Sequence, residues 1–230
     1  MPERLPVLPN TAAKLGAGLV VAALCTALYL LPAQWTLQRA GSLPLADWEQ
    51  AIPYLPLSVW PYLMQYPLLL VAYLGTRDLV QCTRFLLAVL VVQAVAALCF
   101  MAWPLRYPRA LHVAPPDTDA WTLALAEVVR AADQPVNCCP SLHVTSCLLC
   151  MALVGWQSPA RSAFVGLVGV ASMASTLTFK QHYAIDLLAG AVLAGWAWWW
   201  AGRRIMGSPA RQRPAASAAI NAGCTLRPPP

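Results

Sequence analysis

The sequence predicts an all-α, polytopic membrane protein whose fold is a six-transmembrane-helix bundle. Of its 230 residues, 59% are hydrophobic and only 10% are charged, and the mean hydropathy is +0.57. A soluble domain carries about 25% charged residues, so a soluble fold of this composition would expose too much apolar surface. Six apolar segments also follow one another, each long enough or nearly so to cross a hydrocarbon core of about 30 Å. Helices suit these segments because they satisfy their own backbone hydrogen bonds in lipid.

The predicted spans are separated by polar, proline-rich or basic stretches. They cover residues 15–31, 57–75, 85–103, 141–156, 163–179 and 183–201. We expect the first span to be retained, because no small-residue cleavage site ends it convincingly. Before the second span, residues 47–56 either lie at the membrane interface or form an irregular loop. The proline-rich segment 47–67 also contains aromatic residues that suit a belt at the level of the lipid headgroups, namely Trp48, Tyr54, Trp60 and Tyr62.

The distribution of basic residues predicts the orientation. With the N-terminus inside, ten Lys and Arg residues lie in inside segments and five in outside segments. The ten are Arg4, Lys14, Arg77, Arg84, Arg161, Arg203, Arg204, Arg211, Arg213 and Arg227, and the five are Arg39, Arg106, Arg109, Arg130 and Lys180. This bias predicts two cytoplasmic termini and places the long polar loop, residues 104–140, on the outside. The net charge of +6 does not indicate nucleic-acid binding, because the cations form no stripe with interleaved aromatic residues.

The predicted membrane domain covers residues 1–202, with the chemically informative motifs in residues 100–190. Residues 203–230 form a basic tail that contains prolines, and we expect it to be disordered. Of the eight cysteines, Cys25, Cys99, Cys147 and Cys150 lie inside apolar runs and suit packing roles. Cys138 and Cys139 lie on the predicted outside, and the sequence does not decide whether either forms a disulfide.

The first informative motif is Pro140-Ser141-Leu142-His143, at the start of the fourth span. Proline and serine are both favoured at helix starts, so Ser141 alone would be interpreted as a helix cap. A helix start also exposes backbone N–H groups and the positive end of the helix dipole, which favour a phosphate. His143 would lie in the first turn beside such an anion, although a lone interfacial histidine needs no function.

The second motif runs from Ser175 to Asp186 at the junction of the last two spans. His182 and Asp186 are one helical turn apart, so their side chains can meet on one face. A carboxylate on one ring nitrogen fixes the tautomer and leaves the other nitrogen free as a nucleophile. Lys180 could neutralise a phosphate oxygen. A buried structural His–Asp pair is the alternative interpretation.

Taken together, the two motifs resemble those of the type 2 phosphatidic acid phosphatase superfamily. Its second motif reads P-S-G-H, and Leu142 stands at the glycine position. Its third reads S-R-x5-H-x3-D, which Ser175, His182 and Asp186 match, with Thr176 at the arginine position. Leu142 and Lys180 resemble the inositol phosphorylceramide synthase-like branch. The first motif, K-x6-R-P, is poorly kept, and its candidates here are Arg106 and Arg109.

The resemblance implies a lipid phosphate phosphatase in which His182 attacks phosphorus and forms a phosphohistidine. Asp186 would orient His182, and His143 would protonate the leaving oxygen. Lys180, Ser141, Arg109 and Arg106 would bind the phosphate oxygens. The resemblance implies no metal and no other cofactor, and the expected partners are a lipid phosphate or phospholipid substrate and the surrounding membrane lipids.

Other functions remain open at this point. A lipid or sugar alcohol as acceptor would make the protein a phosphotransferase, and a degenerate site would make it a non-enzymatic membrane protein. A zinc site built from Cys138, Cys139, His143, His182 and Asp186 lacks the usual Cys-x2–4-Cys spacing. The expected location is the plasma or inner membrane, or an equivalent endomembrane, with the site on the periplasmic, extracellular or lumenal side. The head group, the lipid tail and the oligomeric state are not predicted.

Overall fold

The structure is a computed structural model that describes residues 6–76, 78–154 and 159–206, and in these ranges it is helical and contains no β-strand. An isolated bridge pairs Gly41 with Leu105. The α-helices are α1 (Thr11–Thr36), α2 (Asp47–Ala51), α3 (Val59–Leu63), α4 (Gln65–Leu74), α5 (Leu79–Ala102), α6 (Ala120–Ala132), α7 (Leu142–Val154), α8 (Pro159–Thr178) and α9 (Ala184–Met206). Two short 3-10 helices, η1 (Pro56–Ser58) and η2 (Arg109–Leu111), lie in the connections.

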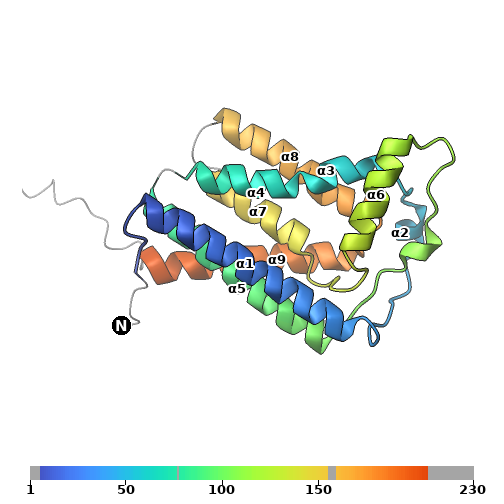
Figure 1. Ribbon diagram of the computed structural model, residues 1–230, viewed down its shortest axis with the longest axis horizontal. Coiled ribbons are helices and arrows are strands. Elements are labelled where there is room, and N and C mark those ends of the chain that lie inside the picture. The colour runs from blue at the N-terminus through green and yellow to red at the C-terminus, as the bar shows by residue number, and fades with distance from the viewer. Residues whose placement is uncertain (1–5, 77, 155–158, 207–230) are drawn as a thin grey trace, which may run out of the picture.

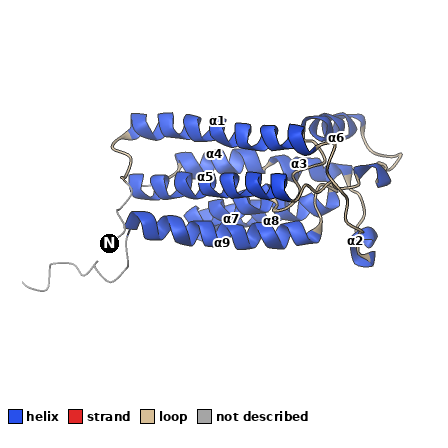
Figure 2. Ribbon diagram, turned by 90° about the horizontal axis from the view of Figure 1, so that it is seen from below, coloured by secondary structure: helices blue, strands red, loops and turns tan. Residues whose placement is uncertain are grey.

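The long helices form a bundle, and α7 lies near its centre. Helix α7 contacts α4, α5, α8 and α9, while α1 packs against α5 and α5 packs against α9. Figure 1 shows that the start of α1 and the end of α9 lie at one end of this bundle. Helices α2 and α6 lie at the other end, where α6 crosses the bundle (Figures 1 and 2). We call this second end, with α2, α6 and the adjoining loops, the capped end.

Five helical segments are long and apolar enough to cross a membrane. They are Thr11–Thr36, Pro56–Leu74, Leu79–Ala102, Pro159–Thr178 and Ala184–Arg204. Their outward side chains are apolar and exposed, with Leu19 and Val192 both at 74% exposure, as expected of surfaces that face lipid. The protein is therefore a helical, membrane-embedded protein, as the composition predicts.

The fourth predicted span is shorter than expected. Helix α7 has 13 residues, whereas an unassisted span needs about 20. The last residues of the predicted segment, 155 and 156, lie outside the described residues. The described residues therefore contain five candidate spans, and the sixth is not confirmed.

The second span is interrupted. Helix α3 ends at Leu63 and α4 begins at Gln65, so Met64 is a junction between two helical pieces. Pro61 and Pro67 lie in these pieces, and neither can donate a backbone hydrogen bond. The stretch before this span contains the short helix α2 rather than irregular loop alone.

Helix α6 is an element that the sequence analysis did not predict, because it lies inside the long polar loop. Asp119 begins it, and its side chain accepts a hydrogen bond from the Thr122 amide at 2.9 Å. Such a side-chain cap is a common start signal for a helix. The loop thereby becomes a structured cover at the capped end.

Helices α7 and α9 approach each other very closely at Gly190. A Cβ atom at this position would lie 2.6 Å from the Ser141 carbonyl oxygen and 3.1 Å from Thr145 Oγ1. Only glycine allows this approach, and it holds the start of α7 against the first turns of α9.

The C-terminal boundary differs in detail from the prediction. Helix α9 continues to Met206, so residues 203–206 extend the last helix. The rest of the predicted tail, residues 207–230, lies outside the described residues.

Candidate active site

The predicted site residues come from chain segments that meet at the capped end. Because the helices alternate in direction, this end holds the C-termini of α5 and α8 and the N-termini of α7 and α9 (Figure 1). Ser141 and His143 begin α7, while Lys180 and His182 lie between α8 and α9. Segments far apart in sequence therefore contribute to one region.

His182 and Asp186 form the pair that their spacing predicts. His182 Nδ1 lies 3.2 Å from Asp186 Oδ2. A carboxylate accepts the hydrogen bond, so Nδ1 carries the proton and Nε2 keeps its lone pair. Both residues are buried, with exposures of 9% for His182 and 0% for Asp186.

Asp186 is itself held in place by backbone groups. Its Oδ2 also accepts the Tyr183 amide at 2.9 Å, and its carbonyl oxygen accepts the Ser141 amide at 3.0 Å. The second contact links the start of α7 to the first turn of α9. The carboxylate therefore orients His182 from a rigid position.

His143 is fixed by Tyr62 of α3. Its imidazole stacks on the Tyr62 ring with centroids 3.8 Å apart, and its Nε2 lies 2.9 Å from the Tyr62 carbonyl oxygen. A carbonyl oxygen only accepts, so Nε2 carries the proton and Nδ1 is the nitrogen left for chemistry. His143 and His182 are also close enough to interact electrostatically.

A partly buried polar network supports Tyr62, and sequence reasoning missed it. Its centre is Asp133, just after α6, whose Oδ2 accepts the Tyr62 hydroxyl at 2.7 Å and whose Oδ1 accepts the Tyr29 hydroxyl. Arg109 Nη2 lies 3.6 Å from Asp133 Oδ2. No local pattern marks Asp133, since its partners come from α1, α3 and η2.

Lys180 occupies an unusual backbone position in the loop between α8 and α9. Its φ is 58°, in the left-handed region that a residue with a side chain rarely adopts. Its side chain is 1% exposed, and Nζ donates to the Glu49 carbonyl oxygen at 3.0 Å. Burial lowers the pKa of the Lys180 ammonium, while the Glu49 carboxylate opposes that shift. Strained residues of this kind are concentrated at functional sites.

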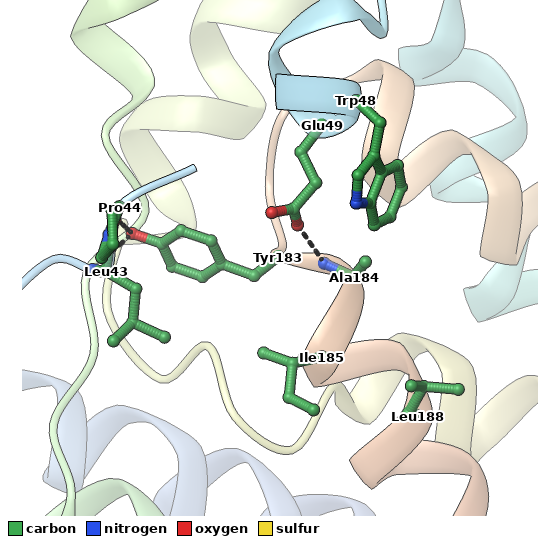
Figure 3. A pocket seen from close by; sticks show the side chains of 8 residues that line it. All are labelled: Leu43, Pro44, Trp48, Glu49, Tyr183, Ala184, Ile185 and Leu188. Carbon is green, nitrogen blue, oxygen red and sulfur yellow. Dashed lines mark hydrogen bonds between the residues drawn. The ribbon is translucent and has the colours of Figure 1, made fainter. Parts of the chain in front are cut away.

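Glu49 connects α2 to the start of α9. Its Oε1 accepts the Ala184 amide at 2.7 Å, and its Oε2 accepts the Ala46 amide at 3.0 Å. The first bond caps α9 directly after His182. Figure 3 shows Glu49 reaching Ala184 across a pocket of about 280 Å³. The pocket is also lined by Leu43, Pro44, Trp48, Tyr183, Ile185 and Leu188.

The remaining predicted phosphate ligands already have protein partners. Ser141 is fully buried, and its Oγ accepts the Val144 amide at 3.4 Å, as a helix-capping serine does. Arg106 donates to the Leu37 carbonyl oxygen. Arg109 Nη1 donates to the carbonyl oxygens of Asp133 and, at 3.3 Å, Arg130. For Arg106 and Arg109, the Nε atom is buried without a partner among the described residues.

The described part of the chain brings no three metal-ligating side chains together. Cys138 and Cys139 are both free thiols, and so are the other cysteines of the described residues. Burial raises the pKa of the Cys139 thiol to about 12, and the Asp186 carboxylate adds to this shift. The thiolate that a metal requires is therefore disfavoured at Cys139.

A comparison with protein families gives a match that covers most of the bundle. No curated protein matches the chain. A family model described as the PAP2 superfamily matches residues 20–200, which include both histidine motifs, the cap and the helices that carry them. The match spans well over half of the chain, and its members are typically phosphatases or phosphotransferases. The chain therefore belongs to the PAP2 superfamily and is a membrane protein of the phosphatase or phosphotransferase type.

Proposed function

We propose that the protein is a lipid phosphate phosphatase that acts through a phosphohistidine at His182. The observation that carries this proposal is the His182–Asp186 pair at 3.2 Å, with His143, at the start of α7, near enough for the two imidazoles to interact electrostatically. A nucleophile oriented by a carboxylate beside a second, separately held imidazole is an arrangement suited to covalent and acid–base catalysis.

The proposed reaction has two steps. His182 Nε2 attacks phosphorus, the bond from phosphorus to the leaving oxygen breaks, and protonated His143 gives its Nδ1 proton to that oxygen. Water then attacks the phosphohistidine, and neutral His143 takes the proton from this water. Asp186 stabilises the positive charge on His182, and Lys180, with Ser141, Arg109 and Arg106, stabilises the phosphate oxygens. No step requires a metal.

An apolar groove beside the site supports a lipid as the substrate. It has a volume of about 630 Å³ and runs between α5 and α9. Pro140 and Ile185 line it, and they directly precede Ser141 and Asp186 in the sequence. Val95, Cys99, Trp103, Cys139, Leu188, Ala189, Val192, Leu193 and Trp196 complete the lining. A hydrocarbon chain in this groove would keep a phosphate head group near the capped end.

We also propose that α7 acts as a sixth span and that the capped end faces away from the cytoplasm. The ten-to-five distribution of basic residues supports this orientation, as does the location of the start of α1 and the end of α9 at the opposite end. A membrane-impermeant thiol reagent should label Leu111→Cys, at a position that is 71% exposed, from the non-cytoplasmic side. Labelling from the cytoplasmic side alone would contradict the orientation.

The alternative within the same chemistry is a phosphotransferase of the inositol phosphorylceramide synthase-like branch. Leu142 and Lys180 favour it, since both resemble that branch. The acceptor distinguishes the two, because an alcohol in place of water would receive the phosphoryl-linked head group from His182.

The test is a reaction screen with the purified full-length protein. The donors are phosphatidic acid, a polyprenyl diphosphate and a phosphatidylinositol-type lipid, each with and without ceramide or diacylglycerol. A phosphatase releases inorganic phosphate without an acceptor, whereas a phosphotransferase forms a new phospholipid only with one. His182→Ala should abolish either activity, because no other group in the site is placed to attack phosphorus.

A control variant separates loss of chemistry from loss of fold. Trp121 lies on the outer face of α6 with 84% exposure, so Trp121→Ala should retain activity. Folded His182→Ala protein that still turns over these lipids would refute the proposal and favour a different nucleophile. No turnover by the unaltered protein would favour a non-enzymatic role.

A further inference from the structure

Arg130, in the last turn of α6, has an unusual set of contacts for a partly buried cation. Its guanidinium lies over the Tyr54 ring, 4.5 Å from the centroid, and 5.9 Å from the Phe179 centroid. Its Nε and Nη2 atoms are buried and have no hydrogen-bond acceptor among the described residues. No ion pair joins Arg130 to a carboxylate in the described part of the chain. The nearby Asp133 carboxylate forms its ion pair with Arg109 instead.

The two unpaired nitrogens lie on one edge of the guanidinium. Nε–H and one Nη2–H point in parallel, which is the geometry that binds two oxygens of a phosphate or carboxylate. A charged donor pair that is removed from water without an acceptor is costly. Tyr54 and Phe179 are nearly fully buried and hold the guanidinium plane in place, so this edge is pre-oriented.

Arg130 also lies near the candidate nucleophile's loop. Phe179, which it contacts, directly precedes Lys180 and belongs to the loop that carries His182. Both cations act on His112: burial lowers the pKa of its imidazole most, and the charges of Lys180 and Arg130 lower it further. Arg130 and Lys180 therefore direct positive charge into the same region from two different elements.

We propose that Arg130 is a phosphate-binding residue, whose free guanidinium edge and the Lys180 ammonium together bind the anionic group of the substrate. This inference rests on the proposed function, which identifies the substrate as a phosphate compound. It assigns to α6 a direct part in binding, and it explains why two buried nitrogens of an arginine on two aromatic rings lack an acceptor.

Inorganic phosphate is the probe, measured by calorimetric titration of the full-length protein in detergent micelles. Arg130→Gln should weaken phosphate binding by about 10- to 100-fold, the range for losing hydrogen bonds to a charged group. The phosphate affinity of Arg130→Lys should lie between those of Arg130→Gln and the unaltered protein, because lysine keeps the charge but lacks the two parallel N–H donors. Arg203→Gln is the matched control, since Arg203 lies over the Trp199 ring at 4.3 Å on the last turns of α9, away from the capped end.

A second measurement needs no substitution at Arg130. Phosphate bound between Lys180 and Arg130 would offset their positive charge, so it should raise the pKa of His112, followed by NMR titration of the imidazole. Equal phosphate binding by the Arg130→Gln and Arg203→Gln variants, no binding by the unaltered protein, or an unchanged His112 pKa would each overturn the inference. Phosphate binding requires no turnover, so a protein that binds phosphate through Arg130 but hydrolyses nothing would refute only the proposed function.

Discussion

His143 can use only one of its two ring nitrogens for chemistry, because the other is held by a backbone group. Nε2 lies 2.9 Å from the Tyr62 carbonyl oxygen, and the imidazole stacks on the Tyr62 ring. His182 is held differently, by a carboxylate that leaves Nε2 unprotonated. The two histidines therefore have different environments, and the proposed mechanism gives them different roles.

This difference predicts different responses to the leaving group. General acid catalysis contributes about 10²–10⁴-fold, so His143→Ala should lower kcat/KM for a lipid phosphate by about that factor. The loss should be much smaller for nitrophenyl phosphate, whose leaving group needs little protonation. His182→Ala should abolish the turnover of both substrates. Identical responses of the two variants to leaving-group quality would show that the histidines lack these distinct roles.

Residue chemistry could be predicted from sequence where partners are close along the chain. His182 and Asp186 meet as predicted, although His182 lies in the loop just before α9 and only Asp186 lies in the first turn of that helix. Asp133 and Arg130 could not be found in this way. Their contacts join α6 to α1, α3 and the loop after α8, and no local spacing records such contacts. The phosphate-binding roles of Lys180, Ser141, Arg106 and Arg109 stay predictions.

At the scale of the elements, the contact between α7 and α9 positions the site. Thr145 Oγ1 donates to the Ser141 carbonyl oxygen at 2.8 Å and to the Gly190 carbonyl oxygen at 3.0 Å. The Ser141 amide in turn donates to the Asp186 carbonyl oxygen. The element that carries His143 is thus joined to the element that carries Asp186.

Gly190→Ala should disturb this contact. The added Cβ would lie 2.6 Å from the Ser141 carbonyl oxygen, which belongs to the backbone and cannot rotate away. Overpacking of this kind costs about 1–3 kcal/mol, and the displacement of α7 should also lower kcat. Thermal unfolding and activity measurements check both effects.

Gly195→Ala is the matched control on the same helix. Nothing lies within 4 Å of a Cβ atom at Gly195, so this change should leave stability and activity nearly unaltered. If Gly190→Ala and Gly195→Ala behave alike, the close approach of α7 and α9 does not position the site.

Hydropathy predicted the long helices because they are apolar throughout. It performed less well where tertiary contacts decide. Helix α6 is short and lies in a polar loop, and the 13-residue helix α7 packs against α4, α5, α8 and α9. The break at Met64 follows from the nearby prolines, Pro61 and Pro67. Hydropathy alone does not show at which residue a proline interrupts a helix.

At the scale of the whole molecule, the bundle has two chemically different ends. One end has the start of α1 and the end of α9, where Arg203 and Arg204 follow a cluster of tryptophans. The capped end has both histidine motifs and Lys180, together with α2 and α6, and Arg130 belongs to α6. The helices between the two ends are long and apolar enough to cross a membrane, as expected of a membrane-embedded bundle.

The most direct test of the central claim is to trap the covalent intermediate. The protein is mixed with nitrophenyl phosphate, quenched in alkali, digested and analysed by mass spectrometry. The account predicts a phosphoryl group on His182 and no adduct in His182→Ala. It also predicts greater accumulation in His143→Ala, because that variant lacks the base that activates water for the second step. Turnover with no adduct on His182, or with an adduct on another residue, would contradict the account.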